Sequence, residues 1–414
     1  MKSVGIIGGG VSGLFSAYYL AKENVEVTIL EEGNFEDGCS FGNAGMIVPS
    51  HIIPLAQPGM IAKGLRWMLR SDSPFYVKPR LSGSLVKWGY LFWKHSTEQH
   101  VRYSIPVLRD ISLLSKRLFQ ELAMEHEVAF GWKEKGLLML FKDAHALPEM
   151  KEEAHLAQQA GLEAQLLSGN EVQALEPNVR VDVAGGLYYP GDAHIYPNQL
   201  VRNLLAVLKA KGVRILENVA VQDFDIQNKK VQAVDTSNGR YCFDEVVVAA
   251  GAWSADLTQK LGISLPLQGG KGYSFMAKPE SQSIQIPSIL LEARATATPM
   301  GGGLRFAGTL EIAGTDTSVN MNRVRGIHSS IQNYYPELSI PFPEKESVWR
   351  GLRPCSPDGL PYIGRVKHLS NLTLATGHGM MGVSLGPATG KLVSEIVSGK
   401  KRSMDIAPFN PDRF

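Results

Sequence analysis

The stretch VGIIGGGVSGLFSAYYLAKENVEVTILEE, residues 4–32, decides the fold of this chain. Residues 4–7 form a short apolar run, which is typical of a buried strand. Residues 14–22 carry apolar side chains at helical spacing, and residues 25–30 form a second apolar run that ends in two glutamates. A strand, a helix and a second strand in this order predict a βαβ unit.

The turn between the first strand and the helix matches G-x-G-x-x-G, the pattern of dinucleotide-binding βαβ units. Gly8 permits the tight turn, Gly10 lets the backbone approach a pyrophosphate, and Gly13 lets the helix pack closely on the strand. Val11 and Ser12 lie in the turn before the helix, whose N-terminus offers free N–H groups and a partial positive charge to phosphates. These five residues are therefore predicted to bind a dinucleotide.

The acid that closes the second strand narrows the choice of dinucleotide. Glu31 can accept hydrogen bonds from both ribose hydroxyls, which disfavours the phosphorylated ribose of NADP. Glu32 follows it and is predicted to share the site. FAD and NAD both remain open from this motif alone.

Length and charge set broad limits on the class of protein. The 414 residues favour two domains, and the formal net charge of +2 gives no reason to expect nucleic acid as a partner. Cys39, Cys242 and Cys355 lack the spacing of metal ligands, so reduced thiols, no metal site and a cytoplasmic location are expected. We expect no leader before residue 4, and no apolar run reaches the roughly 18 residues of a membrane span.

Beyond the βαβ unit, predicted helices and strands are distributed along the whole chain. Helices are expected at residues 60–69, 85–93, 107–126, 149–160, 168–175, 197–211 and 386–398. Strands are expected at residues 136–141, 185–189, 231–235, 240–243, 246–249, 272–277, 304–308 and 372–375. Because pieces of the nucleotide-binding type are scattered, two interleaved domains are predicted rather than two successive ones.

Three further segments suit the close approach of a flat ligand to the backbone. Residues 40–47 and the end of the buried run 246–254 are rich in small residues, and residues 376–383 form a glycine-rich turn before the last helix. A helix N-terminus at the third segment would stabilise the negative charge that reduction places near flavin N1. These segments supply the predicted cofactor-binding residues Ser40, Asn43, Ala44, Gly45, Met46, Ala250, Gly251, Trp253, Gly377, Gly379, Met380, Met381 and Gly382.

With these segments in order along nearly the whole chain, the sequence resembles the D-amino-acid oxidase superfamily of FAD enzymes. That superfamily includes glycine and sarcosine oxidases and bacterial D-amino-acid dehydrogenases. The motifs GLRP at 351–354 and PDGLP at 357–361 add to the resemblance. The dehydrogenase subgroup is the most similar one, on the evidence of the motifs Asn43-Ala44-Gly45, Pro49, Pro58-Gly59, Trp67, Trp88, Lys271-Gly272-Tyr273-Ser274 and Gly377-His378-Gly379.

The resemblance implies FAD rather than NAD, with Val219 and Arg353 completing the predicted cofactor-binding residues. It also implies an α/β fold in which a Rossmann-like FAD-binding domain is interleaved with an α+β substrate-binding domain that contains a mixed sheet. The FAD-binding domain would comprise residues 1–59, 190–265 and 346–414. The substrate-binding domain would comprise residues 60–189 and 266–345.

The resemblance further implies non-covalent FAD. In the sarcosine oxidases that bind flavin covalently, the linking cysteine lies several residues before the Pro-Asp pair. This chain has Gly351 in that region, and Cys355 is near but does not match.

Oxidation of an amino acid by flavin needs a carboxylate anchor more than it needs acid or base catalysis. Arg353 is the predicted anchor, because a guanidinium binds a carboxylate bidentately and the resemblance assigns this role to it. The alternative for Arg353 is a surface arginine in a loop, and Arg350 is predicted to be structural. Tyr273 could reach the substrate carboxylate or close the pocket, or simply pack. His378 is predicted to hydrogen-bond flavin or product rather than to act as a base.

Two other features leave alternatives open. His51 and His194 could line the pocket, although structural histidines are the favoured interpretation. Residues 63–94 combine Trp67, Trp88, Tyr90, Phe92 and Trp93 with basic residues that include Arg70, a composition that suits helices lying in a membrane interface. Packing of these helices on the substrate domain is the favoured alternative.

The sequence thus predicts an FAD-dependent enzyme that deaminates D-amino acids to 2-oxo acids and ammonia by hydride transfer to flavin N5. Electrons would pass to a quinone or another carrier, with peripheral contact at the inner face of the membrane. The alternatives are oxidation of a secondary amino acid (D-hydroxyproline, D-proline or sarcosine) and an oxidase that uses oxygen. A non-catalytic FAD-binding protein and an NAD-dependent dehydrogenase are alternatives from other classes.

Overall fold

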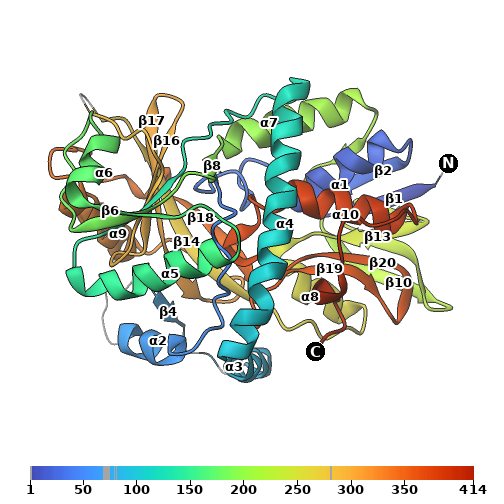
Figure 1. The fold of residues 1–414 in the computed structure, drawn as a ribbon. Helices are drawn as coiled ribbons and strands as arrows, with labels where there is room; N and C mark the ends of the chain where they lie inside the picture. The colour runs from blue at the N-terminus through green and yellow to red at the C-terminus, as the bar shows by residue number, and fades with distance from the viewer. Residues whose placement is uncertain (1, 69–74, 79, 81, 280–281) are drawn as a thin grey trace.

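Two large β-sheets lie side by side in the protein, and α4 (Glu98–Glu125) runs along one side of their junction (Figure 1). The computed structural model describes residues 2–68, 75–78, 80, 82–279 and 282–414. One sheet is mostly parallel and contains the βαβ unit, whereas the other is mixed. The predicted α/β fold class with a second, mixed sheet is therefore confirmed.

The first sheet, within the described residues, has six strands in the order β19-β20-β13-β1-β2-β9. All its neighbouring strands are parallel except β19 and β20. Ile6 in the middle of β1 pairs with Val247 on one side and Ile29 on the other, so the apolar runs of the sequence form the centre of the sheet. The strands are β1 (Ser3–Ile7), β2 (Glu26–Leu30), β9 (Arg214–Leu216), β13 (Glu245–Val248), β19 (Tyr362–Val366) and β20 (Leu369–Thr376).

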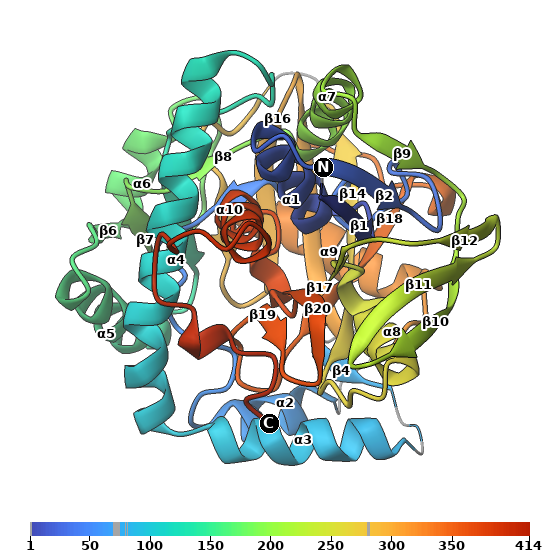
Figure 2. The ribbon, with the colours of Figure 1, turned by 90° about the vertical axis from the view of Figure 1, so that its right-hand side faces the viewer.

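Both faces of this sheet are covered, because successive side chains of a strand point to opposite faces. Ile6 packs in a cluster with α1 (Val11–Lys22), α4, α7 (Pro197–Ala210) and α10 (Gly386–Val397). Ile7 packs in another cluster with the small antiparallel sheet of β10 (Val221–Gln227), β11 (Lys230–Thr236) and β12 (Gly239–Tyr241). Figure 2 shows α4 and α10 on one side of the parallel strands and β10, β11 and β12 on the other.

The second sheet, as far as the chain is described, has nine strands in the order β18-β14-β17-β16-β15-β5-β7-β6, with β4 also paired to β17. The pairs β15–β5 and β17–β4 are parallel, and the other pairs are antiparallel. The strands are β4 (Phe75–Val77), β5 (Leu137–Phe141), β6 (Gln165–Ser168), β7 (Gly185–Tyr189), β14 (Gln268–Ala277), β15 (Ser288–Leu290), β16 (Ala295–Met300), β17 (Gly303–Ile312) and β18 (Trp349–Cys355).

Short elements complete the described chain. A two-stranded pair, β3 (Met46–Ile47) with β8 (Ala193–His194), joins distant segments. The other α-helices are α2 (Met60–Met68), α3 (Gly83–His95), α5 (Leu147–Gln159), α6 (Gly169–Leu175), α8 (Ser254–Lys260) and α9 (Met321–Tyr334). The 3₁₀ turns are η1 (Ala144–Ala146), η2 (Gly251–Trp253), η3 (Lys345–Ser347), η4 (Gly379–Met381) and η5 (Ala407–Phe409).

Two predicted helix starts are wrong, one of them by more than two turns. The helix predicted to begin at residue 107 begins at Glu98, because the side chain of Thr97 caps it and Pro106 lies inside it. Proline is common in the first turn of a helix, so the sequence around Pro106 resembles the start of a helix and the first two turns were missed. The first helix begins at Val11 rather than at residue 14. The end of the predicted helix 60–69 lies outside the described residues at position 69.

The division into two domains stays a prediction, and two elements lie across its boundaries. β18 belongs to the nine-stranded sheet, although residues 346–414 were assigned to the other domain. α4 packs against α10 beside the six-stranded sheet, although residues 60–189 were assigned to the substrate domain. Segments that contribute to the two sheets thus alternate along the chain more often than the predicted boundaries suggest.

Candidate active site

A cavity of about 930 Å³ extends from β1 and α1 to the nine-stranded sheet and the helices α2 and α3. This volume is at the upper end of the roughly 300–1,000 Å³ that small-molecule pockets occupy. Most of the predicted cofactor-binding residues line this cavity: Gly8, Gly10, Val11, Ser12, Glu31, Glu32, Ser40, Asn43, Ala44, Met46, Val219, Ala250, Gly251, Trp253, Arg353, Gly379, Met380, Met381 and Gly382. Gly13, Gly45 and Gly377 are not among its lining residues.

The glycines of the βαβ turn differ in what surrounds them. Gly8 has a φ of +103°, and a Cβ there would lie 2.6 Å from the carbonyl oxygen of Ala249. A Cβ on Gly13 would lie 2.0 Å from the carbonyl oxygen of Gly8, so Gly13 brings α1 close to the end of β1. The nearest atom to a Cβ on Gly10 is the hydroxyl oxygen of Ser40, at 3.6 Å. Gly10 is thus the glycine that leaves open space toward the cavity.

The N-terminus of α1 offers this part of the cavity an anion site. Gly10 occupies the N-cap position with no side-chain cap, and the first turn carries no acidic residue. The backbone N–H of Val11 donates to the hydroxyl of Ser40 at 2.9 Å. Uncapped N–H groups and the helix dipole together favour a phosphate at this position. The cradle therefore fits the pyrophosphate of a dinucleotide.

The carboxylate of Glu31 is held at the cavity wall by two backbone groups. Its Oε2 accepts from the N–H of Gly9 at 2.6 Å, and its Oε1 accepts from the N–H of Gly33 at 3.0 Å. Each oxygen retains a second lone pair, so the carboxylate can also accept from a ribose hydroxyl. The backbone N–H of Val219 donates to the carbonyl oxygen of Glu31 at 2.8 Å and fixes the neighbouring strand end.

The loop of residues 40–46 is fixed by a residue that the sequence analysis missed. Arg305 donates from Nη1 to the carbonyl oxygens of Asn43 at 2.8 Å and Phe41 at 3.2 Å. Ser274 donates from its hydroxyl to the carbonyl oxygen of Gly42 at 2.7 Å. Burial lowers the pKa of Arg305 to about 10. An arginine on β17 gave no sequence signal, because its partners are backbone carbonyls of a distant loop.

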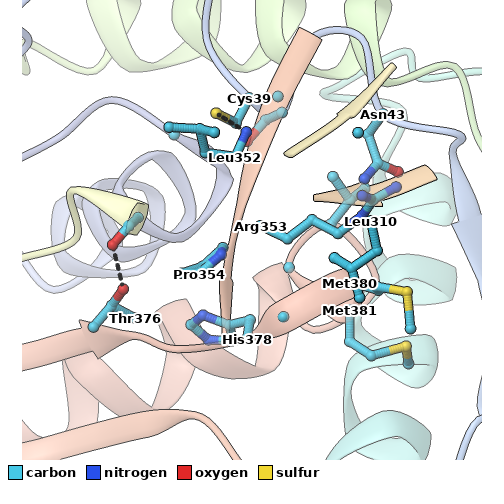
Figure 3. Close-up of a pocket in the computed structure, with 18 of the residues that line it drawn as sticks. Cys39, Asn43, Leu310, Leu352, Arg353, Pro354, Thr376, His378, Met380 and Met381 are labelled. Carbon is cyan, nitrogen blue, oxygen red and sulfur yellow. Dashed lines mark hydrogen bonds between the residues drawn. The ribbon is translucent and has the colours of Figure 1, made fainter. Parts of the chain in front are cut away.

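The third glycine-rich segment brings a neutral histidine to the cavity. His378 lines the cavity, and its Nε2 lies 2.9 Å from the hydroxyl oxygen of Thr389. Burial lowers the pKa of His378 to about 4, so the ring is neutral at pH 7. The hydroxyl of Thr376 donates to the carbonyl oxygen of Gly251 at 2.8 Å, which ties this segment to the end of β13 (Figure 3).

Arg353 lies on a strand, not in a surface loop. It is the fifth residue of β18 and reaches toward the side of the cavity where Asn43 and Leu310 lie (Figure 3). Its Nη1 donates to the carbonyl oxygen of Thr309 at 2.7 Å. Burial lowers the pKa of Arg353, and no described carboxylate lies within ion-pair distance of it. A half-buried guanidinium that lines a cavity and has no ion pair to a described carboxylate is ready to bind an anionic ligand.

Arg350, the other arginine of this strand, has an ion pair with Asp37, with Nη1 and Oδ1 2.5 Å apart. The prediction that Arg350 is structural fits this contact. The carboxylates among the described lining residues are Glu31, Glu32 and Asp256, and none of them lies on β14, β17 or β18. The charged lining residues near these strands are therefore cationic, and they include Arg353 and Arg294.

The hydroxyl of Tyr273 is used elsewhere. The Tyr273 ring lines the cavity, but its hydroxyl donates to Oε1 of Glu311 at 3.3 Å and accepts from the N–H of Asn320 at 3.3 Å. Glu311 is itself buried and paired with Arg323 at 2.5 Å and with Lys271 at 3.6 Å. Burial and the Glu311 carboxylate raise the pKa of Tyr273. The expected contact of this hydroxyl with a substrate carboxylate thus does not match its bonding, and a catalytic role for Tyr273 stays a prediction.

His51 and His194, whose roles the sequence left undecided, differ in position. His51 lines the cavity, and its Nδ1 lies 3.3 Å from the hydroxyl of Ser50, which donates to Asp192 at 2.5 Å. His194 is buried in β8 and is not among the lining residues. Burial lowers the pKa of both rings to about 4 and raises the pKa of Asp192 to about 7.

The thiols show no arrangement of metal ligands among the described residues. Cys39 lines the cavity, and its Sγ accepts from the N–H of Leu352 at 3.2 Å. Cys355 is buried, and its thiol donates to the carbonyl oxygen of Arg353 at 3.4 Å. Non-covalent binding of FAD stays a prediction.

Helices α2 and α3 close the outer end of the cavity. Their inner faces line it with Met60, Ile61, Gly64, Leu85, Trp88, Gly89 and Phe92. Trp88 stacks on Phe92 and donates from Nε1 to the carbonyl oxygen of Cys355 at 2.9 Å. The predicted membrane-interface stretch includes the side chain of Trp67 and residue Arg70, which lie outside the described parts of the chain. Among the described helices, none has the length and apolar character needed to cross a bilayer.

A parallel sheet with a dinucleotide-binding turn lies beside a mixed sheet that carries an arginine to the same cavity, and this arrangement suits an enzyme that binds a dinucleotide and an anionic substrate. The chain belongs to the family of FAD dependent oxidoreductases, whose family model matches residues 3–396. The cofactor is therefore FAD, as predicted.

Relatives of known name cover nearly the whole chain. The chain is 32% identical over 413 residues to a D-amino acid dehydrogenase of Vibrio vulnificus, with 97% of each chain covered. It is 32% identical over 425 residues to a D-amino acid dehydrogenase of Paramagnetospirillum magneticum, with 100% and 99% covered. Its fold is similar to the crystal structure of glycine oxidase from Geobacillus kaustophilus, with a TM-score of 0.81, 25% identity and full coverage of both chains. The predicted resemblance is confirmed.

Proposed function

We propose that this protein is an FAD-dependent D-amino acid dehydrogenase that converts D-amino acids to 2-oxo acids and ammonia. The observation that carries the proposal is Arg353, a half-buried guanidinium at the cavity wall with no ion pair to a described carboxylate. A protein that only stores FAD would not need such a group. The names of relatives that cover at least 97% of the chain support the choice of D-amino acids.

The residues around Arg353 suit an amino acid. Arg353 binds the substrate carboxylate and thereby directs the Cα–H bond. His51 and His378 are neutral at pH 7 and do not repel the amino group. Apolar side chains such as Met139 and Leu310 line the same cavity and limit the access of water. FAD, when bound, would supply the acceptor for the hydride that leaves Cα, and the imino acid product would be hydrolysed by water.

The two halves of FAD can be assigned to different parts of the same cavity. The adenosine and pyrophosphate would lie at Gly10, Val11 and Glu31, where the N-terminus of α1 and the held carboxylate meet. The flavin would lie near residues 43–46, 251 and 377–382, most of which line the same cavity as Arg353. These assignments are proposals for individual residues.

Anaerobic mixing of the holoenzyme with candidate substrates tests the proposal. D-amino acids with neutral side chains should abolish the visible absorbance of the oxidised flavin, whereas their L-isomers should leave it unchanged. Bleaching by L-isomers alone would overturn the stereochemical assignment. Rapid bleaching by D-proline, D-hydroxyproline or sarcosine, with slow bleaching by primary D-amino acids, would instead favour a secondary amine as the substrate.

Substitution of Arg353 tests the anchor itself. Arg353→Ala should raise KM for the best D-amino acid by about 10² to 10³, because a charge-assisted bidentate contact is worth a few kcal/mol. Arg350→Ala is the matched control, since Arg350 is on the same strand but is paired with Asp37. An Arg353→Ala enzyme with unchanged KM would remove Arg353 from the substrate site.

We further propose that electrons pass to a membrane quinone. The helices whose inner faces close the cavity expose apolar side chains on the outside: Val86 is 72% exposed, Tyr90 58% and Trp93 63%. These three residues are spaced as one face of α3, and Lys87 and Lys94 flank them. α2 and α3 lie together at one end of the molecule in both views (Figures 1 and 2).

Vesicle sedimentation and reoxidation assays test this second step. The holoenzyme should sediment with vesicles that contain anionic lipid, and the variant Val86→Ser/Tyr90→Ser/Trp93→Ser should not. The control is Tyr103→Ser/Met124→Ser, which removes exposed apolar side chains from α4 instead. Reduced enzyme should be reoxidised faster by a water-soluble quinone than by oxygen. Faster reoxidation by oxygen would identify an oxidase.

A further inference from the structure

The guanidinium of Arg353 lies directly over a glycine of the neighbouring strand. β14 and β18 are antiparallel, and the register sets Gly272 beside Gly351, two residues before Arg353. A Cβ built on Gly272 would lie 2.2 Å from Nη1 and 2.6 Å from Cζ of Arg353. No side chain fits between them, so only glycine at position 272 leaves the guanidinium in its present place.

On the other side, an irregularity in β17 supplies the acceptor for the same guanidinium. Lys271 pairs with Glu311 and Tyr273 pairs with Gly308, so two residues of β17, Thr309 and Leu310, face the single residue Gly272. This two-against-one arrangement is a β-bulge, which locally redirects the strand. The carbonyl oxygen of Thr309, at the bulge, accepts from Nη1 of Arg353 at 2.7 Å.

The backbone of the bulge is strained. Thr309 has a φ of +69°, in the left-handed region that β-branched residues rarely adopt. Bulges of this kind commonly use glycine at the position with positive φ. Strained backbone of this kind persists where the surrounding structure enforces it, and it gathers at functional sites. Here the strained residue supplies a carbonyl oxygen that accepts a hydrogen bond from Arg353.

We propose that Gly272 and the bulge at Thr309 form a seat that positions Arg353 for the substrate carboxylate. The inference rests on the proposed function, because it takes Arg353 as the carboxylate anchor. Gly272 supplies the space, and the Thr309 carbonyl occupies one N–H of the guanidinium and fixes its plane. The remaining N–H groups are then left in a defined orientation for a bidentate contact. Both residues are positioning residues, since they act through Arg353.

A double-mutant cycle on the holoenzyme tests this proposal. The probe is benzoate, a carboxylate that has no Cα–H bond to oxidise, and its Kd is read from the change in flavin absorbance. Gly272→Ala should raise the Kd of benzoate and the KM of the best D-amino acid at least tenfold, because the added methyl displaces the guanidinium. In an Arg353→Ala background, Gly272→Ala should change the Kd less than twofold, since the group it displaces is gone.

A second variant separates the backbone of the bulge from its side chain. Thr309→Gly keeps a residue that adopts positive φ freely, so the carbonyl stays in place and the Kd of benzoate should change less than twofold. Arg353→Lys keeps the charge but loses the planar fork that the seat holds, and it should raise the Kd at least tenfold. Arg353→Lys changes no residue of β14 or β17, so it tests the proposal even if the Gly272→Ala protein fails to fold.

The outcomes distinguish the inference from the proposed function. If Arg353→Ala leaves the Kd unchanged, the anchor is wrong and the seat fails with it. If Arg353→Ala weakens binding but Gly272→Ala does not, the seat alone is overturned. An effect of Gly272→Ala that persists at full size in the Arg353→Ala background also overturns it, because the glycine would then act through the sheet. Arg353→Lys binding as tightly as the unchanged protein would do the same.

Discussion

Buried titratable side chains decide how this protein responds to pH. Burial lowers the pKa of His194 to about 4, whereas the unfolded ring titrates near its usual value of roughly 6.5. The unfolded chain therefore binds a proton between these values and the folded chain does not, so stability falls as the pH falls from about 6.5 to 4. Asp192 has the opposite effect, because its pKa is raised to about 7 and stability falls as the pH rises from about 4 to 7.

Two single substitutions should reveal these opposing contributions. His194→Gln should remove part of the loss in the free energy of unfolding that occurs as the pH falls from 6.5 to 4, and this part is of the order of 1–3 kcal/mol. Asp192→Asn should remove the loss of stability that occurs between pH 4 and 7, and its polar contacts with Ser50 can be kept by the amide. Thermal unfolding of the holoenzyme across this pH range measures both effects. If the Tm of each variant changes with pH as steeply as that of the unchanged protein, His194 and Asp192 do not cause these pH effects.

Individual residues of the candidate cofactor site were easier to recognise in the sequence than those of the candidate substrate site. The glycines and Glu31 were recognisable because their local spacing has one physical purpose. Arg353 was recognised by resemblance, but its strand and the Thr309 carbonyl were not expected. Arg305 was missed, since its function depends on a loop that lies far away in the sequence.

Among the elements, α1 has glycines with two different tasks. Gly13 is packed against β1, so Gly13→Ala should destabilise the apoprotein by about 1–3 kcal/mol through overpacking. Gly10 faces the cavity, so Gly10→Ala should weaken FAD binding at least tenfold while leaving the stability of the apoprotein within about 0.5 kcal/mol.

Urea unfolding of the apoprotein and FAD titration of both variants measure this difference. The helix is the same in the two cases, so each variant serves as the control for the other. Equal stability of the two apoproteins would show that the close packing of α1 on β1 is relaxed at little cost.

Element boundaries follow local signals only where those signals are strong. The capping box at Ser168 and Glu171 and the apolar strand β7 were predicted correctly from the sequence alone. The start of α4 was missed because Pro106 resembles a first-turn residue although it lies in the third turn. β18 was not among the predicted strands, since the glycine, arginine and proline in it have no strand pattern without the neighbouring β14.

For the whole molecule, the mode of FAD attachment can be tested directly. Acid precipitation should leave all the flavin in the supernatant, because the thiol of Cys355 is buried and bonded to a backbone carbonyl. Yellow colour in the washed pellet would contradict non-covalent binding. Excess FAD should also raise the Tm of the apoprotein, since a ligand that binds only the folded state stabilises it by mass action.

The fold class followed from the first 32 residues and from the later glycine-rich segments, whereas the pairing of distant strands did not. Nothing local indicates that β20 is a neighbour of β13, or that β18 joins the sheet of β5 and β14. Such pairings depend on the register and twist of the complete sheets. The presence of a parallel and a mixed sheet was therefore predictable, whereas the order of their strands was not.

The order of strands in the parallel sheet has a consequence for biosynthesis. β1 leaves the ribosome first, yet its neighbour β13 comes more than half the chain later, and β20 later still. The walls of the cofactor cavity include both Gly10 and Gly379, near opposite ends of the polypeptide. A nascent chain that has not yet exposed its last hundred residues has no complete cavity for the flavin. We therefore expect FAD to bind late in synthesis, after the βαβ unit has already left the ribosome without its ligand.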